Sequence, residues 1–344
     1  MKRVRLPAST TGRLLLVTVP ALLLVALAVW RGPEFSILER AFRAVEWEWV
    51  AVAVLVNLFS VIVRAQAWRI VIKQAVPAPW PRRRNVFSAF CVGLLANAAL
   101  PGRVGELARV AVVTRHVRRR AGTWATIVGT VFAHRVFDVV VSVALVVYTL
   151  YAAPIPGWAE PVLAAVVGIG LGFLLAGFLF ARRHHRPLSE EFGPLRRVLH
   201  MARSGLTVLR RPVPAFQALL LQLVGWAAQL LAVYTAMLAF GIDPSIAEAA
   251  LVLVIINLVM VFPFWPGNVG LVQAAVAAAL LPYGVSYGHG ILFGIGLQAI
   301  EASVGVGLGF LFLAREGFTF AMLRRMPEVT DVEIDDDERV ERIA

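Results

Sequence analysis

Six ionisable side chains lie within or beside apolar runs that are long enough to span a bilayer. They are Arg103, Glu106, Arg109, Arg135, Asp138 and Glu301. On membrane-insertion scales a charged residue costs about 2.5–3.5 kcal/mol at the bilayer centre, whereas a Leu or Val returns only about 0.3–0.6 kcal/mol. We therefore expect these side chains to face one another, the protein interior or a hydrated cavity, and not lipid.

The spacing of five of these residues allows them to pair. Arg103, Glu106 and Arg109 follow one another at i,i+3 spacing, and Arg135 precedes Asp138 by three residues. Three arginines against two acids leave one positive charge, which favours an anionic ligand such as a lipid phosphate. The alternative is a closed network of ion pairs that only fixes the local structure. Arg109 could also extend to the lipid headgroups as an anchor.

Two helix-breaking sequences of the form P-G-x-V-G interrupt the apolar regions, one in each half of the chain. They contain Pro101, Gly102 and Gly105 in the first half, and Pro266, Gly267, Asn268 and Gly270 in the second. Matched breaks in two halves of a membrane protein are typical of transporter binding sites. The helix after the first break should direct free N–H groups towards the tip, which suits an anion.

Other polar side chains are expected to complete this cavity. Asn97, Asn268 and Gln273 could cap the broken helices or contact a substrate, and we favour capping. Gln298 and Glu301 share one face at i,i+3 spacing and would form part of the wall. His134 could shuttle a proton, although a neutral buried histidine is the favoured interpretation.

The sequence contains no pattern that predicts a metal site, a cofactor or catalysis. Cys91 is the only cysteine, and no P-loop, CxxC, HExxH or GxSxG motif occurs in a suitable context. We therefore expect no cofactor and no enzymatic activity. An intramembrane lipid-modifying enzyme that uses Glu106 and Asp138 is a further alternative.

The elements that position these residues are predicted to be helices in a membrane. Hydrophobic residues make up 59% of the 344, and charged residues only 16%. We predict an all-α polytopic membrane protein with about six full spans and two re-entrant helical hairpins. The spans are 14–30, 49–63, 123–151, 161–181, 213–240 and 291–314, and the hairpins are 86–113 and 249–281.

The formal net charge of +12 is explained by topology and not by nucleic acid, because the basic residues lie between the apolar runs. Arg64, Arg69 and Lys73 are interpreted as the cytoplasmic exit of the second span. The basic segment 182–212 is either an amphipathic interfacial helix or a solvated linker. Both termini are predicted to be cytoplasmic, in a multi-pass protein of the cell membrane.

Each half of the chain contains span, span, hairpin and span. Residues 1–151 and 152–315 are therefore predicted half-repeats, and 316–344 a disordered tail. Three spans per half is an odd number, so the second half should be inverted relative to the first. The hairpins would then enter from opposite faces and meet near the midplane.

The stretch 97–109, the later Arg135-Val-Phe-Asp138, and 266–270 resemble the flippase-like transmembrane region of lysylphosphatidylglycerol synthases and its stand-alone relatives. The resemblance covers about residues 10–315. It implies a lipid translocase that handles headgroups at the residues that match, Arg103, Glu106, Arg109, Arg135 and Asp138, without the soluble aminoacyl-transferase domain. His134 and Gln273 depart from the family pattern, in which Glu is common, and this puts proton coupling in doubt.

The expected function is a flippase for an anionic or polyprenyl-phosphate-linked lipid, so the expected partner is a membrane lipid. The alternative is a non-transporting scaffold that recruits envelope-biosynthesis enzymes through segment 182–212 and the acidic tail.

Overall fold

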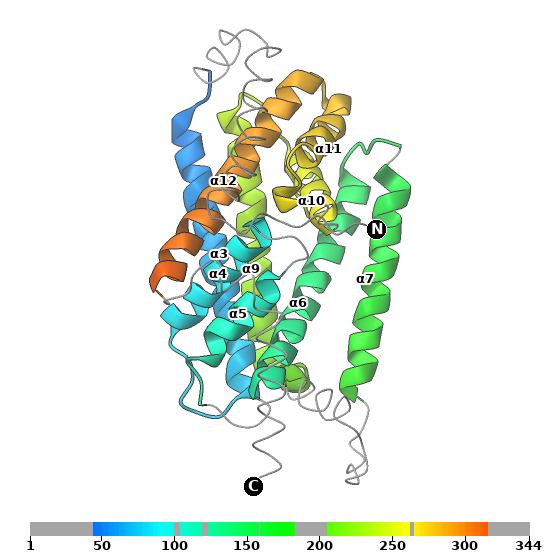
Figure 1. Cartoon of the computed structure of the whole chain (residues 1–344). Coiled ribbons are helices and arrows are strands. Elements are labelled where there is room, and N and C mark those ends of the chain that lie inside the picture. The colour runs from blue at the N-terminus through cyan, green and yellow to red at the C-terminus, as the bar shows by residue number, and fades with distance from the viewer. Residues whose placement is uncertain are drawn as a thin grey trace, which may run out of the picture. The chain divides into compact units, whose positions relative to one another are not determined.

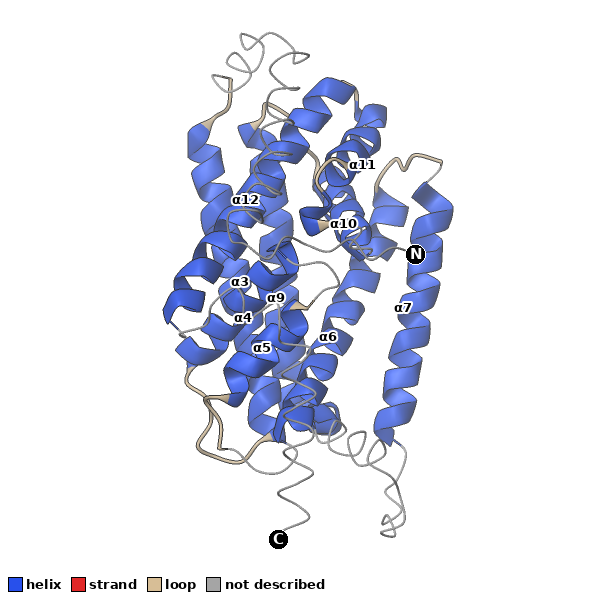
Figure 2. Cartoon of the chain, viewed as in Figure 1, coloured by secondary structure: helices blue, strands red, loops and turns tan. Residues whose placement is uncertain are grey.

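The described part of the chain is built from helices, with no strand (Figure 2). The computed structural model describes residues 44–99, 104–118, 123–157, 159–182, 205–261 and 265–315. The α-helices are α3 (Trp47–Ala75), α4 (Arg83–Ala99), α5 (Gly105–Thr114), α6 (Thr123–Ala152), α7 (Ala159–Arg182), α9 (Pro212–Ala239), α10 (Ile246–Val261), α11 (Leu271–Leu280) and α12 (Tyr287–Arg315). The 3-10 helices are η1 (Gly205–Arg210), η2 (Pro266–Asn268) and η3 (Leu281–Tyr283). These helices all belong to one compact unit, and the predicted all-α class is confirmed.

Four helices in the described ranges are long and apolar enough to cross a membrane: α3, α6, α9 and α12. They have 28 to 30 residues, or about 42–45 Å of helix, which exceeds the roughly 30 Å hydrocarbon core. The last three agree within four residues with the predicted spans 123–151, 213–240 and 291–314. The predicted span 161–181 corresponds to α7, and 14–30 lies outside the described residues.

The predicted end of the second span, at residue 63, is wrong. Helix α3 continues to Ala75 because its sequence contains neither Gly nor Pro before Pro77. Arg64 therefore lies near the centre of a long helix and not in a cytoplasmic loop.

Two further apolar regions of the chain form pairs of short helices and not full spans. Helices α4 and α5 pack together, as do α10 and α11, and with 10 to 17 residues each is too short to cross the hydrocarbon core. In the second break Gly267, Asn268 and Gly270 have φ values of 66°, 46° and 91°, which is the region that favours Gly and tolerates Asn. Pro101 and Gly102, of the first break, lie outside the described residues.

Helix α12 contacts both helical pairs through its glycines. Gly290 and Gly294 in its first half approach α11, and Gly305 and Gly309 in its second half approach α4. The missing side chains allow this close packing. The two pairs therefore lie towards opposite ends of α12, as Figure 1 also shows. Their entry from opposite membrane faces, the inverted repeat and the boundary at residue 151 stay predictions.

The described part of segment 182–212 is neither a solvated linker nor an amphipathic α-helix. Its residues 205–210 form η1, which packs against α3 and α6 with Val208 buried. Gly205 lies directly against the backbone of Gly129. Residues 183–204 and the tail 316–344 lie outside the described residues.

Candidate functional site

Polar side chains gather at the middle of the long helices. Asp138 and Trp226 lie at the midpoints of α6 and α9, and Glu301 is the central residue of α12. Arg64 lies three residues after the midpoint of α3. A helix that spans a bilayer places its midpoint near the bilayer centre. This cluster therefore lies at membrane depth.

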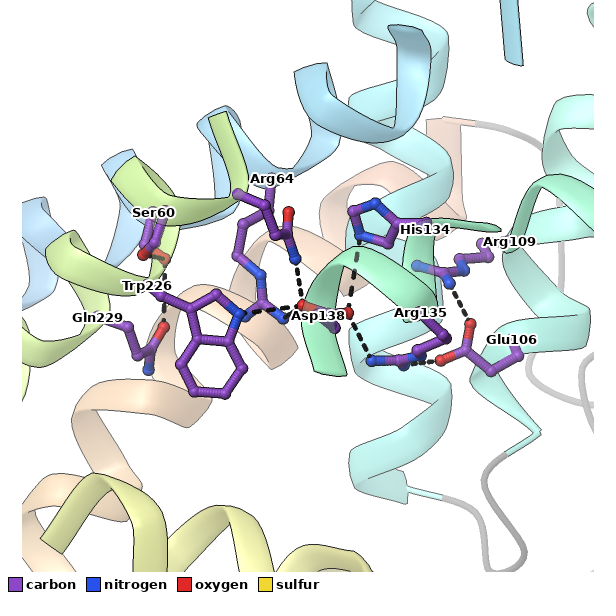
Figure 3. Close-up of polar contacts among 11 residues, drawn as sticks. Ser60, Arg64, Glu106, Arg109, His134, Arg135, Asp138, Trp226 and Gln229 are labelled. Carbon is purple, nitrogen blue, oxygen red and sulfur yellow. Dashed lines mark hydrogen bonds and ion pairs between the residues drawn. The ribbon is translucent and has the colours of Figure 1, made fainter. Parts of the chain in front are cut away.

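Asp138 is the centre of the cluster, and its side chain is buried. Its Oδ1 accepts hydrogen bonds from Arg64 Nη2 at 3.1 Å, from Trp226 Nε1 at 3.1 Å and from the Gln222 amide. Its Oδ2 accepts from Arg135 Nη1 at 3.0 Å. Figure 3 shows these groups converging on one carboxylate from α3, α6 and α9.

The network continues from Asp138 to α5. Arg135 also donates to Glu106, and Glu106 pairs with Arg109. Cations and anions thus alternate in the order Arg109, Glu106, Arg135, Asp138, Arg64 (Figure 3). The expected i,i+3 pairs of Glu106 with Arg109 and of Arg135 with Asp138 are present.

The described network contains three arginines and two acids, the same numbers as the cluster expected from the sequence. Its third arginine, beside Arg109 and Arg135, is Arg64. Arg103, which the sequence assigned to this role, lies outside the described residues. The net formal charge of this five-residue network is one positive charge.

The network is most accessible at Glu106 and Arg135, in the middle of this order, and Arg64 at one end is 20% exposed. The side chains of Arg135 and Glu106 are 40% and 27% exposed, whereas those of Arg109 and Asp138 are 5% and 6% exposed. A ligand from outside would therefore meet Arg135 and Glu106 first. Asp138 supports Arg135 from the interior.

Arg109 is buried between aromatic rings. Its guanidinium lies 4.8 Å from the centre of the Trp68 ring and 5.5 Å from that of Phe90, positions at which a cation is attracted to the ring face. The interpretation of Arg109 as an anchor in the headgroups is therefore wrong.

His134 is buried beside Phe90, with the ring centroids 6.1 Å apart. Its Nε2 is 3.9 Å from Asp138 Oδ2, too far for a hydrogen bond. Neither ring nitrogen has a hydrogen-bond partner among the described residues. His134 thus has no hydrogen-bonded route for a proton within this part of the chain.

The start of α5 is partly occupied by groups of the protein itself. Asn97 Oδ1 accepts a hydrogen bond from the Gly105 N–H at 2.8 Å, so the capping interpretation of Asn97 is confirmed. Glu106 places a negative charge in the first turn, where it complements the helix dipole. A Cβ at position 105 would overlap the Gly93 carbonyl and the Asn97 side chain, so Gly105 is required for close packing. An anion at this end of α5 would compete with Asn97 and Glu106.

Side-chain amides satisfy the backbone of the second break. Asn268 donates to a carbonyl of α10 at 2.9 Å, and Gln273 accepts from the Gly270 N–H at 2.6 Å. Gln273 donates to Gln298, which in turn donates to the Gly267 carbonyl. The capping interpretation of Gln273 is therefore confirmed, whereas the bond from Asn268 satisfies the end of α10 and not the start of the return helix α11. Gln298 supports the same break from α12.

Glu301 has different neighbours from Gln298. Its Oε1 accepts from Gln229 Nε2 at 3.1 Å, and the side-chain oxygen Oε1 of Gln229 accepts from Ser60 Oγ at 3.3 Å. Ser60 also contacts the Gly225 carbonyl at 2.7 Å. Glu301 thus contacts α9, and through it α3.

Five polar residues of this site were missed from the sequence. They are Ser60, Arg64, Gln222, Trp226 and Gln229. Those of α9 have the spacing i, i+4, i+7, which places them on one face of the helix. A polar stripe on one face of an apolar helix predicts that this face lines a polar site.

The donor set suits ionic recognition better than metal binding. Within the described ranges, no three His, Cys, Asp or Glu side chains come together as a metal site would require. Arginine, in contrast, presents a planar fork of N–H donors that matches carboxylate and phosphate groups. The accessible Arg135 of the network offers this chemistry.

Comparisons with known proteins cover the whole site. The family model of the lysylphosphatidylglycerol synthase TM region matches residues 12–327. A protein of Methanothermobacter thermautotrophicus described as a UPF0104 membrane protein is 25% identical over 285 residues, or 77% of this chain and 81% of that protein. No solved structure matches the chain. The family match includes every described helix and all residues of the ion-pair network.

Proposed function

Because the chain belongs to the family of the lysylphosphatidylglycerol synthase transmembrane region, whose members are multi-pass membrane proteins, we propose that it moves an anionic lipid headgroup between leaflets. The observation that carries this proposal is the ion-pair network at the centre of the long helices. It is buried at Asp138 and accessible at Arg135 and Glu106. A phospholipid and a polyprenyl-phosphate-linked lipid share the phosphate that would be recognised.

The phosphate would bind by exchanging partners with Glu106. Arg135 holds Asp138 with one terminal nitrogen and Glu106 with the other. A phosphate at Arg135 would replace the Glu106 carboxylate, which keeps Arg109 as its partner. The headgroup thus gains a charge-assisted hydrogen bond without leaving a carboxylate unpaired. The acyl chains remain in the lipid.

A network that only braces the helices accounts less well for the exposure of Arg135. Asp138 and Arg109 are buried, as a brace requires, but Arg135 is accessible to a ligand. The positive charge of Arg135 needs an anionic partner at membrane depth. Glu106 is that partner in the empty site, and a phosphate can take its place. We also propose that the lipid is moved without chemical change.

The test is lipid translocation in reconstituted vesicles. Fluorescent phosphatidylglycerol is the probe, and a membrane-impermeant quencher reports the outer leaflet. We expect Arg135→Ala to slow translocation about tenfold to hundredfold, because a hydrogen bond to a charged group contributes about 1.5–3 kcal/mol. Arg84→Ala is the matched control, since Arg84 is exposed and outside the network. A fluorescent monoglycosyl lipid, which carries no phosphate, is the lipid control.

Two results would overturn the proposal. One is wild-type protein that moves neither phosphatidylglycerol nor a polyprenyl-phosphate lipid faster than protein-free vesicles do. The other is an Arg135→Ala variant with the wild-type rate, which would remove the site. Mass spectrometry of the recovered lipid separates translocation from modification, because we expect the mass to be unchanged.

A further inference from the structure

Glu301 differs from the other acids at membrane depth because no cation pairs with it in the described part of the chain. Its only partner there is the neutral Gln229 amide, at 3.1 Å. Asp138 and Glu106, in contrast, each pair with two arginines. Glu301 is also the central residue of α12. A carboxylate without a counter-ion at this depth is costly, and the uptake of a proton removes that cost.

Arg64 lies one helical turn after Ser60, which donates to Gln229, so it is the charged residue of α3 on the side of the contact between Gln229 and Glu301. Its guanidinium is already bonded to Asp138 and lies 5.4 Å from the centre of the Trp226 ring. Helices α3, α4, α9 and α11 pack against α12. From α9, the neutral Gln229 contacts Glu301. From α11, the neutral Gln273 contacts Gln298, one turn before Glu301 on α12.

We propose that Glu301 is the site at which a proton binds and is released during transport, so that lipid movement is coupled to a proton gradient. This inference rests on the proposed function. The proton is taken from water on one side of the membrane and returned to water on the other. No bond of the lipid forms or breaks.

The contact with Gln229 is compatible with both protonation states. Gln229 Nε2 donates to Oε1 of Glu301, and a proton can occupy Oε2 while that hydrogen bond persists. The residue can therefore change its charge without losing its partner. A metal cation such as Na⁺ fits less well, because Gln229 presents an N–H group and not an oxygen to the carboxylate.

The position of Glu301 connects its charge to both helical pairs. One turn earlier on α12, Gln298 holds the Gly267 carbonyl of the second break. One turn later, Gly305 begins the contact with α4. Protonation neutralises Glu301 and so weakens its charge-assisted hydrogen bond with Gln229, which joins α9 to α12. Helix α12 is then free to shift against the elements that carry the two breaks.

The first experiment measures protonation without transport. Infrared difference spectra of the full-length protein in vesicles are recorded over about pH 4–9, the range that includes the ordinary Glu titration. We expect a protonated-carboxyl band that disappears with rising pH, and that is lost in Glu301→Gln but kept in Glu248→Gln. Glu248 is half-buried at the start of α10, far from Glu301 in the sequence, and accepts a hydrogen bond from the Ser245 N–H. Identical spectra for wild type and Glu301→Gln would overturn the inference.

The second experiment measures coupling. A gradient of about one pH unit, with the membrane potential clamped by potassium and valinomycin, drives up to about a tenfold ratio of labelled phosphatidylglycerol between leaflets for one proton per lipid. We expect this shift in the wild type, a smaller one in Glu301→Asp, and none in Glu301→Gln. Each ratio is compared with the same variant without a gradient, and unfolding midpoints identify variants that fail to fold.

The outcomes separate the two proposals. Wild-type translocation that ignores the pH gradient, or that follows a Na⁺ gradient, overturns the proton site and leaves the lipid function intact. The absence of any translocation overturns the proposed function and the coupling together. A Glu301→Gln variant that still accumulates lipid in response to the pH gradient also overturns the proton site.

Discussion

Replacing Asp138 with asparagine removes the negative charge on which α3, α6 and α9 converge. The new amide oxygen can still accept from Arg64, Gln222 and Trp226, which now bond to Oδ1. The amide nitrogen then faces Arg135, where Oδ2 accepted a hydrogen bond. A donor therefore meets a donor, and two arginines lose the charge of their shared partner.

The size of the effect follows from the burial of each partner. Removal of one member of a buried ion pair costs about 3–5 kcal/mol, whereas a hydrogen bond between membrane helices averages only about 0.6 kcal/mol. Arg135 is 40% exposed and retains Glu106 as an ion-pair partner. Solvation therefore reduces the contribution of the pair between Arg135 and Asp138 to the free energy of unfolding. Arg64 is 20% exposed, and Asp138 is its only ion-pair partner in the described chain. We expect a loss of about 3 kcal/mol in the free energy of unfolding.

The assay is reversible unfolding in mixed micelles with increasing dodecyl sulfate, followed by far-UV circular dichroism. Asp243→Asn is the matched control, because Asp243 lies in the exposed turn after α9, and its effect should remain within about 0.5 kcal/mol. A double-mutant cycle with Arg64→Met measures the pair itself. We expect a coupling of about 1–3 kcal/mol between the two positions.

The reasoning fails if Asp138→Asn costs less than about 0.5 kcal/mol, the range of ordinary surface changes. It also fails if the effects of Asp138→Asn and Arg64→Met simply add. Either result would mean that the carboxylate does not stabilise the convergence of the three helices.

The glycines provide three further predictions for the same unfolding assay. Gly105→Ala should destabilise by about 1–3 kcal/mol, because the new Cβ would overlap the Gly93 carbonyl and the Asn97 side chain. Gly267→Ala should cost about 1–2 kcal/mol, because φ at this position is 66°. Gly168→Ala should be neutral or stabilising by about 0.5–1 kcal/mol, since this exposed helical position has no described atom within 4 Å of the new Cβ. A larger loss at Gly168 than at Gly105 would contradict the packing explanation.

Local spacing predicted a substantial part of the site. Glu106 with Arg109, and Arg135 with Asp138, pair at the i,i+3 distances that the sequence displays. The helical pairs were also predictable, because Pro and Gly interrupt apolar segments in both halves. These features depend on neighbours in the chain, and a sequence shows such neighbours directly.

Arg64 was not predicted, because its partner Asp138 lies 74 residues away in the sequence. A basic residue near the end of an apolar run fits the usual pattern of a cytoplasmic loop, so its charge was placed outside the membrane. The contrary signal was the uninterrupted helical sequence that continues to Ala75. Helix continuity outweighs the charge rule here, because Asp138 compensates the charge of the Arg64 guanidinium.

The two breaks have different chemistry, and this bears on release of the headgroup. The first pair of helices contributes the charged Glu106 and Arg109, while the second is held by the neutral amides of Asn268 and Gln273. A transport pathway must bind strongly enough to admit its substrate and weakly enough to release it. Under the proposed function, a phosphate that leaves Arg135 towards the second break would meet dipoles and not another guanidinium. Glu106 would then restore the pair with Arg135 behind the departing lipid, so the empty site contains no unpaired carboxylate.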